Sequence, residues 1–410
     1  MAHTSIVQEL VDYCNAPENQ DFKVQFQQAV DLALQTGLEV FDKYGIKNLD
    51  DYFSYMDKYV YWVPSEDNTG TNVFYHICVF YFILDLPPLA QQQNPINPTT
   101  QPPYQWLSEW LIRYAKEMGR WMDSPGSITK QAIDTFRNAE DYHMDDYIEP
   151  EDGWVTFNQF FVRLLKPGKR PIAPDTSDSF VIVSPADCAY DGQWTIDDKA
   201  DVTTFSVKGV PWSISQLLDD TEYGPKFAGG TFTHSFLGPH DYHRQHAPVS
   251  GTIVEAKIIP GICYLEVVLK KDDTNGGGRP TLGMHRPIRS KREVPGVIPI
   301  EEAAGTVNTN LDAPDTAGYQ FLQARALILI DNPDLGLVAV LPIGMAQVSS
   351  VVLQVKPGRR VEKGDEISYF QFGGSDIVMV FEKDAQVKID QKEGQHYNYG
   401  TQVATAPRKK

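Results

Sequence analysis

The stretch Phe372-Gly373-Gly374-Ser375-Asp376 runs directly into the apolar segment Ile377–Phe381. A short run of β-branched and aromatic residues beside a glycine turn predicts a buried strand. Similar runs recur from about residue 150 onward: Phe180–Val183, Gly251–Ile259, Cys263–Leu269, Ala326–Ile330, Leu337–Leu341 and Val351–Val355. The sequence therefore predicts a β-rich domain over residues 151–410.

The N-terminal third has a helical pattern instead. A first helix is predicted from an N-cap at Asp21 to a stop at Gly45, with these apolar residues at helical spacing: Phe26, Val30, Leu34 and Phe41. A second is predicted from an aromatic stripe that we assign to core packing: Trp106, Trp110, Tyr114 and Met118. Residues 87–103 are a predicted loop or linker. We therefore predict an α+β protein with a mainly helical N-terminal domain over residues 1–150.

Composition narrows the function further. The chain has 410 residues, with 36 Lys and Arg against 54 Asp and Glu, giving a net charge of −18. Nucleic-acid binding needs a basic surface, so nucleic acid is not an expected partner. The run Val73–Leu86 is shorter than the roughly 20 residues that span a bilayer, so we expect a buried helix or strand. Residues 1–15 lack a secretory pattern, and the four cysteines are predicted to be reduced, as in a soluble cytoplasmic protein.

A long polar insertion, residues 271–320, separates two groups of predicted strands. It contains three consecutive glycines, 276–278, which we interpret as a flexible loop because they lack the strand and helix that flank a phosphate-binding loop. It also contains four basic residues, which form either a solvated patch or a grip for a substrate carboxylate or phosphate: Arg286, Arg289, Lys291 and Arg292.

Three short segments supply residues that are capable of catalysis. They are Ser184–Cys188, Asp241–Pro248 and Phe372–Asp376. Taken singly, they are a turn capped by an aspartate, a polar surface segment and a hairpin. Together they supply Asp187, His246 and Ser375, the three parts of an activated-hydroxyl site. Glycine before Ser375 reduces crowding, so its hydroxyl can approach the neighbouring Gly374 carbonyl.

The order and content of these segments resemble the phosphatidylserine decarboxylase family of pyruvoyl enzymes. The likeness extends from about Trp154 to Phe381 and includes these stretches: Phe160-Phe161-Val162-Arg163, Lys169-Arg170-Pro171, Ser184-Pro185-Ala186-Asp187, Lys208-Gly209, Tyr242-His243-Arg244-Gln245-His246-Ala247-Pro248, Gly344-Met345-Ala346-Gln347-Val348 and Gly373-Gly374-Ser375. The helical region resembles the extra domain of soluble members, including fungal tryptophan decarboxylases. Asp376 and Cys188 depart from the usual pattern, which has Thr after the serine and Gly after the aspartate.

This resemblance implies a self-processing proenzyme. Asp187 orients His246, which takes the proton of Ser375, and the serine oxygen attacks the Gly374 carbonyl carbon. An ester forms and eliminates, so the chain separates into 1–374 and 375–410, which stay associated. Residue 375 becomes a covalent pyruvoyl group that forms a Schiff base with the substrate amine. His243 returns a proton to the substrate or holds its carboxylate.

The sequence leaves alternatives open for both the substrate and the class of enzyme. The acidic charge favours a free, possibly aromatic, L-amino acid over the headgroup of phosphatidylserine. A serine hydrolase would use the same Asp187, His246 and Ser375, although the Gly-x-Ser-x-Gly pattern is missing. A zinc site at the evenly spaced histidines 240, 243 and 246, with His234 near, and a carrier module over Val355–Ile367 are weaker alternatives. We therefore predict no metal.

Overall fold

The computed structural model describes residues 3–173, 175–198, 204–207, 210–272, 279–288, 294, 296–300, 302, 318–346, 350–372 and 375–408. Several residues singled out in the sequence lie outside this part of the chain: Lys208, Gly209, glycines 276–278, Arg289, Lys291, Arg292, Gln347, Val348, Gly373 and Gly374.

Helices dominate the first 140 residues and are rare afterwards. Their bounds are α1 Ser5–Asn15, α2 Gln20–Gln35, α3 Glu39–Tyr44, α4 Leu49–Val60, α5 Asn72–Asp85, α6 Trp106–Met122, α7 Lys130–Asn138, α8 Phe157–Phe161 and α9 Ile214–Leu217. The run Val73–Leu86 is thus a helix, α5, and its residues from Ile77 to Asp85 are all buried. No helix within the described ranges is long and apolar enough to cross a membrane.

The first predicted helix is in fact two helices. α2 ends before Gly37, whose φ of 68° lies in the left-handed region, and α3 begins at Glu39. A glycine is favoured there because it has no Cβ to clash in that conformation. The predicted stop at Gly45 is confirmed by its left-handed φ of 72°. The predicted cap at Asp21 is wrong by two residues, since Asn19 precedes α2.

The rest of the chain forms antiparallel sheets. Their strands are β1 Tyr147–Ile148, β2 Leu164–Leu165, β3 Val181–Val183, β4 Cys188–Thr195, β5 Thr204–Val207, β6 Val210–Ser213, β7 Thr231–Leu237, β8 Arg244–His246, β9 Gly251–Ile259, β10 Val267–Asp272, β11 Arg279–Met284, β12 Val297–Ile298, β13 Arg325–Asn332, β14 Gly336–Gly344, β15 Val351–Leu353, β16 Arg360–Val361, β17 Glu366–Phe370, β18 Ser375–Phe381, β19 Lys388–Ile389, β20 His396–Tyr397 and β21 Gln402–Thr405. The α+β class predicted from the sequence is confirmed.

One large sheet organises the β-rich part. Its order is β16-β9-β13-β14-β18-β7-β4-β20, so β18 lies inside the sheet between β14 and β7. A smaller sheet has the order β15-β17-β8. The predicted strand over Ile377–Phe381 is therefore confirmed as a buried, central strand. The prediction over Cys263–Leu269 is only half right, since β10 begins at Val267.

The polar insertion is not simply a loop. β11 and β12 pair with β10 on either side to make a small sheet. This sheet lies beside α5, and the Tyr75 hydroxyl is hydrogen-bonded to the Thr281 hydroxyl at 2.7 Å. Arg286 is buried, so the prediction of a solvated patch is wrong for this residue.

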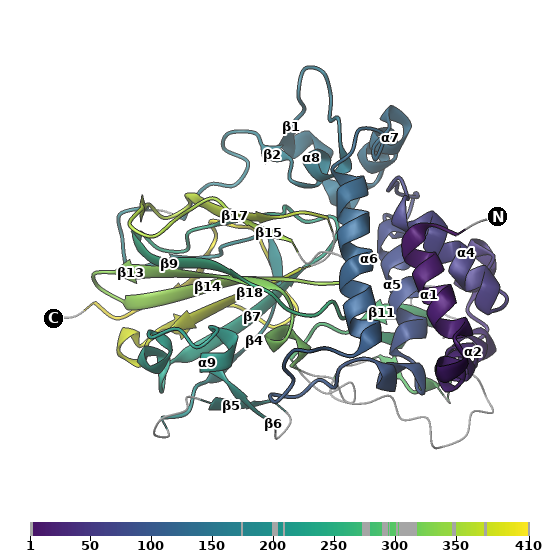
Figure 1. Ribbon diagram of the computed structural model, residues 1–410. Coiled ribbons are helices and arrows are strands. Elements are labelled where there is room, and N and C mark those ends of the chain that lie inside the picture. The colour runs from purple at the N-terminus through teal and green to yellow at the C-terminus, as the bar shows by residue number, and fades with distance from the viewer. Residues whose placement is uncertain are drawn as a thin grey trace.

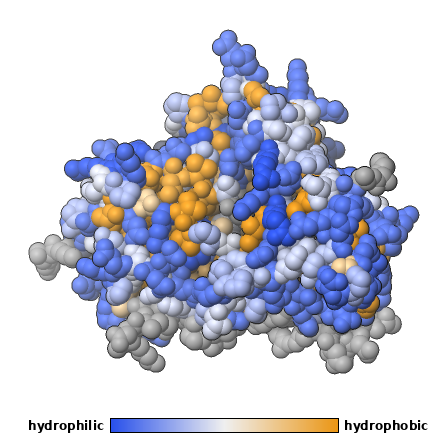
Figure 2. Space-filling view, viewed as in Figure 1, coloured by the Kyte–Doolittle hydropathy of each residue, from blue (hydrophilic) through white to orange (hydrophobic). Residues whose placement is uncertain are grey.

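The helices stack along one end of the sheets, and α6 runs beside the strands (Figure 1). A single hydrophobic cluster contains residues from α1 to α6 together with residues from β9, β14 and β18. The viewed surface is mostly hydrophilic, with a large apolar patch near its centre and a smaller one near the top, where β1, β2 and α8 lie (Figure 2). Ile148 and Leu164 pair across β1 and β2 there, and both are exposed.

Candidate active site

Ser375 is the first residue of β18. It pairs with Gly344 of β14 on one side and with Leu237 of β7 on the other. The residue is fully buried, and its hydroxyl has no hydrogen-bond partner within the described structure. Burying an unsatisfied hydroxyl costs about 1–3 kcal/mol, so such a group calls for a functional explanation.

The side chains of Ser375 and Asp376 point to opposite faces of the sheet. Successive residues alternate along a strand, and the two hydrophobic clusters record this alternation. Ile377, Met379 and Phe381 belong to the cluster shared with the helices, whereas Val378 and Val380 belong to the other. The unusual carboxylate is therefore directed away from the serine hydroxyl, although the two residues are adjacent.

Asp376 is neutralised on its own face by Arg286. The Arg286 Nε donates to Asp376 Oδ1 at 3.0 Å, and a terminal guanidinium nitrogen contacts the other carboxylate oxygen. The same guanidinium donates to the Tyr319 hydroxyl at 2.9 Å. His234 Nε2 lies 3.5 Å from Asp376. Both ionic partners are buried, so each charge depends on the other for its solvation.

This ion pair yields a stability prediction. Arg286→Met should lower the free energy of unfolding by about 3–5 kcal/mol, because it leaves a buried carboxylate without its partner. Urea unfolding in a Ser375→Ala background, where the chain stays uniform, measures this. Arg137→Met is the control, because it breaks the exposed Arg137–Glu149 pair and should cost less than about 1 kcal/mol. Equal losses for the two variants would contradict the assignment.

His243 lies near the end of β17 that leads to Ser375. Its carbonyl accepts from the Phe370 N–H at 2.9 Å, and its ring stacks on Phe161 with centroids 3.9 Å apart. The side chain is fully buried, and within the described structure neither ring nitrogen has a hydrogen-bond partner. Burial lowers the pKa of His243 to about 3, so the imidazole is neutral at physiological pH.

Phe161 connects His243 to the residues before Ser375. Its ring also packs against Phe372, with centroids 5.6 Å apart. Phe372 in turn is separated from Ser375 only by Gly373 and Gly374 in the sequence. A buried, neutral histidine and the Gly-Gly-Ser segment are thus held against the same aromatic side chain.

His246 is the last residue of β8, and both of its ring nitrogens are hydrogen-bonded. It pairs with Glu366, at the end of β17 away from Phe370. Its Nδ1 is 2.7 Å from the Gly364 carbonyl, which only accepts, so Nδ1 carries the proton. Its Nε2 therefore accepts from the Tyr242 hydroxyl at 3.1 Å. Burial lowers the pKa of His246 to about 4.

Asp187 is held by other partners than His246. Arg170 donates to both carboxylate oxygens at 2.8–3.3 Å, and the Tyr399 N–H donates to Oδ1 at 2.7 Å. Burial raises the pKa of the Asp187 carboxyl, and the Arg170 charge opposes this shift. The His246 ring stacks on Tyr399 at 3.9 Å, so the two residues share a neighbour without a described hydrogen bond between them. Among the described residues, no hydrogen bond joins Asp187 to His246 or His246 to Ser375, so the predicted triad of Asp187, His246 and Ser375 stays a prediction.

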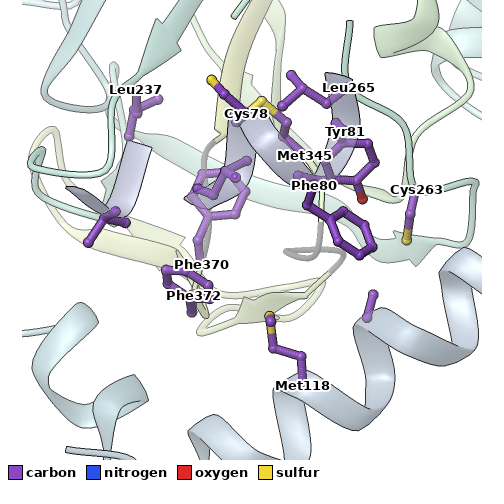
Figure 3. Close-up of a cluster of buried hydrophobic side chains, with 14 of the residues drawn as sticks. Cys78, Phe80, Tyr81, Met118, Leu237, Cys263, Leu265, Met345, Phe370 and Phe372 are labelled. Atoms are coloured by element: carbon purple, nitrogen blue, oxygen red, sulfur yellow. The ribbon is translucent and has the colours of Figure 1, made fainter. Parts of the chain in front are cut away.

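The helical region contributes directly to the surroundings of β18. Figure 3 shows Cys78, Phe80 and Tyr81 of α5 gathered with side chains of the β-rich part. The shared cluster includes Leu237, the partner of Ser375, and Met345, which follows its other partner. Met118 of α6 and Phe372 also belong to it (Figure 3). Side chains of α5 and α6 therefore belong to the same hydrophobic cluster as residues on the face of the sheet where the Ser375 side chain lies.

Sequence reasoning missed several of these neighbours. Phe161 and Arg170 lie in stretches quoted for the family resemblance, but nothing in the sequence assigns them these contacts. Tyr399 lies beyond the end of the compared stretch. Within the described residues, no group of three or more His, Cys, Asp or Glu is placed to hold a metal ion.

Comparison with known proteins shows which family the chain resembles. Residues 157–405 match the family model described as phosphatidylserine decarboxylase. The chain is 33% identical over 267 residues to phosphatidylserine decarboxylase proenzyme 3 of Schizosaccharomyces pombe, covering 65% of this chain but 22% of that protein. It is 32% identical over 266 residues to decarboxylase iboD of Amanita muscaria, covering 62% of this chain and 68% of the relative.

A bacterial relative is covered more completely. The phosphatidylserine decarboxylase proenzyme of Fusobacterium nucleatum is 31% identical over 285 residues, which are 70% of this chain and 76% of that protein. These matches define a class, the decarboxylases that are made as proenzymes and carry a covalent pyruvoyl group. The chain belongs to the phosphatidylserine decarboxylase family.

Proposed function

We propose that this chain is a pyruvoyl-dependent decarboxylase that cleaves itself between Gly374 and Ser375 and then removes the α-carboxylate of a free amino acid. The observation that carries the proposal is the buried Ser375 hydroxyl at the start of a central strand, which has no hydrogen-bond partner among the residues that the structure describes. A serine fixed by strand pairing on both sides, with an apolar face around it, fits the family's use of this position as the source of its pyruvoyl group.

Self-cleavage requires the serine proton to leave. The Ser375 oxygen attacks the Gly374 carbonyl carbon, the peptide C–N bond breaks, and an ester remains. Elimination then frees the Gly374 carboxylate and leaves dehydroalanine, which takes up water and releases ammonia. We propose His243 as the base, because neither of its ring nitrogens has a hydrogen-bond partner among the described residues, whereas both nitrogens of His246 are hydrogen-bonded.

In this proposal, Asp187 and His246 stabilise the strand pairing that holds His243, and they do not take the serine proton. With Arg170, Tyr242 and Tyr399 they form a connected polar set at one end of β8. That set fixes the start of the strand pairing between His246 and Glu366. His243, three residues earlier, is then held at the other end of the same pairing, next to Phe370.

After cleavage, the pyruvoyl group supplies an electron-withdrawing carbonyl without any bound cofactor. The chain's own residues provide the surroundings. Phe161, Phe370 and Phe372 are buried and apolar, and such surroundings disfavour a charged carboxylate relative to neutral carbon dioxide. His243 is the proposed donor of the proton that returns to the substrate Cα.

A free amino acid is favoured over a lipid headgroup by the position of the helices. Side chains of α5 and α6 share a hydrophobic cluster with Leu237, the residue that pairs with Ser375 (Figure 3). The chain is also strongly acidic, with a net charge of −18, which disfavours approach to anionic lipid. The likeness to decarboxylase iboD is consistent with this preference.

Phosphatidylserine is the second candidate, because one exposed apolar feature suits lipid contact. Ile148 and Leu164 are 44% and 48% exposed and lie opposite each other on β1 and β2. Val155 nearby is 51% exposed. A tip of this kind is able to insert into the headgroup region of a bilayer.

Measured carbon dioxide release separates the two substrates. Purified, self-cleaved protein is incubated with a panel of amino acids and, separately, with phosphatidylserine vesicles. We expect release from a free amino acid, unchanged in the Ile148→Ser, Leu164→Ser double variant. Release from vesicles alone, lost in the double variant, would assign the lipid instead.

A further inference from the structure

A buried amide side chain, that of Asn158, is hydrogen-bonded to the main chain three residues before Ser375. Asn158 lies on α8 and is 4% exposed. Its Oδ1 accepts from the Phe372 N–H at 2.9 Å. Phe372 is followed by Gly373, Gly374 and then Ser375, so this hydrogen bond lies just upstream of the proposed cleavage point.

A carboxylate fixes the direction of that amide. The Asn158 Nδ2 donates to Asp123 Oδ1 at 2.8 Å, and Asp123 directly follows α6. A carboxylate only accepts, so it holds the amide nitrogen and leaves the amide oxygen directed at the Phe372 N–H. Gln371 Nε2 donates to the same Asp123 oxygen at 3.3 Å. Asp123 therefore holds Gln371 directly and Phe372 through Asn158.

The side chain of Phe372 is held as firmly as its backbone. Its ring packs against Phe157 and Phe161 of α8, with centroids 5.2 and 5.6 Å apart. Trp62, just after α4, contacts it from the helical region at 6.4 Å. Within the described structure the chain is thus anchored at Phe372 and again at Ser375, with two glycines between the anchors in the sequence.

Attack by a serine on its own preceding carbonyl depends on placement. Reacting atoms must lie about 3–3.5 Å apart with aligned orbitals, and a displacement near 1 Å costs about 100-fold in rate. β18 fixes the nucleophile. The carbonyl belongs to a glycine, which imposes little conformational preference of its own, so its placement depends on what holds the preceding residues.

We propose that Asn158 is a positioning residue for self-cleavage, holding the chain before the scissile bond in an orientation set by Asp123. The proposal rests on the self-cleavage put forward above. It gives the helical region a role in maturation, because Asp123 belongs to the end of α6 and not to the β-rich part.

The test follows chain cleavage over time during cell-free synthesis. Asn158→Ala should slow the appearance of the two product chains by at least about 10-fold, within the range expected of lost positioning. Asn332→Ala is the matched control, because Asn332 is also buried and also bonds backbone groups, far from the cleavage point. We expect this control to cleave at the wild-type rate.

A paired exchange separates positioning from folding. Asn158→Asp places a second carboxylate against Asp123 and should slow cleavage. In the double variant Asn158→Asp, Asp123→Asn, the amide at position 123 donates to the carboxylate at position 158, so the hydrogen bond between the two side chains is restored. We expect the double variant to recover to within a few-fold of the wild-type rate. Recovery of this kind is not expected if Asn158 merely fills space.

The outcomes separate this inference from the proposed function. A wild-type chain that never cleaves would overturn the proposed function itself. A cleaving wild type with Asn158→Ala at the same rate would overturn only the inference. If Asn158→Ala does not fold, the double variant Asn158→Asp, Asp123→Asn provides the test. A folded double variant that cleaves as slowly as Asn158→Asp would reject the inference.

Discussion

Replacing Ser375 by alanine is expected to leave a single 46.1 kDa chain and no decarboxylase activity. The wild type should instead separate on a denaturing gel into residues 1–374 and 375–410. The reason is chemical, because alanine has no hydroxyl to attack the Gly374 carbonyl and none from which a pyruvoyl group forms. The loss of activity should therefore be complete.

Intact mass spectrometry makes this prediction specific. The smaller wild-type chain should be lighter by one ammonia than the same residues beginning with serine. It should remain bound to the larger chain under native conditions, because β18 pairs with β14 and β7 along its whole length. Ser108→Ala, which removes another buried serine hydroxyl on α6, should cleave normally. An active wild type with an unbroken chain would refute the proposed chemistry and favour a serine hydrolase.

The second large effect is expected at His243. His243→Ala should slow self-cleavage by about 100- to 10,000-fold, the usual contribution of a general base. His246→Ala should slow it less, because that ring already donates to Gly364 and accepts from Tyr242. Time courses during cell-free synthesis measure both rates side by side.

The sequence alone leads to the opposite order, so this experiment discriminates. If His246→Ala abolishes cleavage while His243→Ala cleaves normally, His246 is the base, as the triad of Asp187, His246 and Ser375 predicts, and the assignment of His243 is wrong. Unfolding of both variants in a Ser375→Ala background checks that neither rate reflects a collapsed fold. His243→Ala that cleaves but does not decarboxylate would restrict His243 to the later step.

Local patterns predicted much of the architecture correctly. β18, β13 and β14 read as strands because their β-branched and apolar residues are buried on both faces of an internal strand. The aromatic stripe of α6 read as a helix face and is buried as expected at Trp110, Tyr114 and Met118. The errors lie where local signals compete, as at Gly37, which divides the first predicted helix although the apolar spacing continues through it.

The proposed catalytic residues were also recognised in the sequence, but the contacts of their side chains were not. Asp187, His243, His246 and Ser375 all belong to segments that the sequence marked, but each has a partner far away along the chain or no described hydrogen-bond partner. Asp187 bonds Arg170 and Tyr399, and the Phe161 ring stacked on His243 comes from 82 residues earlier. Spacing along a chain does not report such contacts.

The sequence by itself determined the family, the mixed helical and β-rich composition, and the serine that follows two glycines. These are carried by residue identity and local order, which a linear chain displays in full. Only the tertiary structure decided that Asp376 points away from Ser375, that Arg286 neutralises it, and that α8 and the end of α6 grip the chain before the serine. Such facts depend on strand register and on which distant segments pack together, and burial makes their energies large because water cannot substitute for the missing partner.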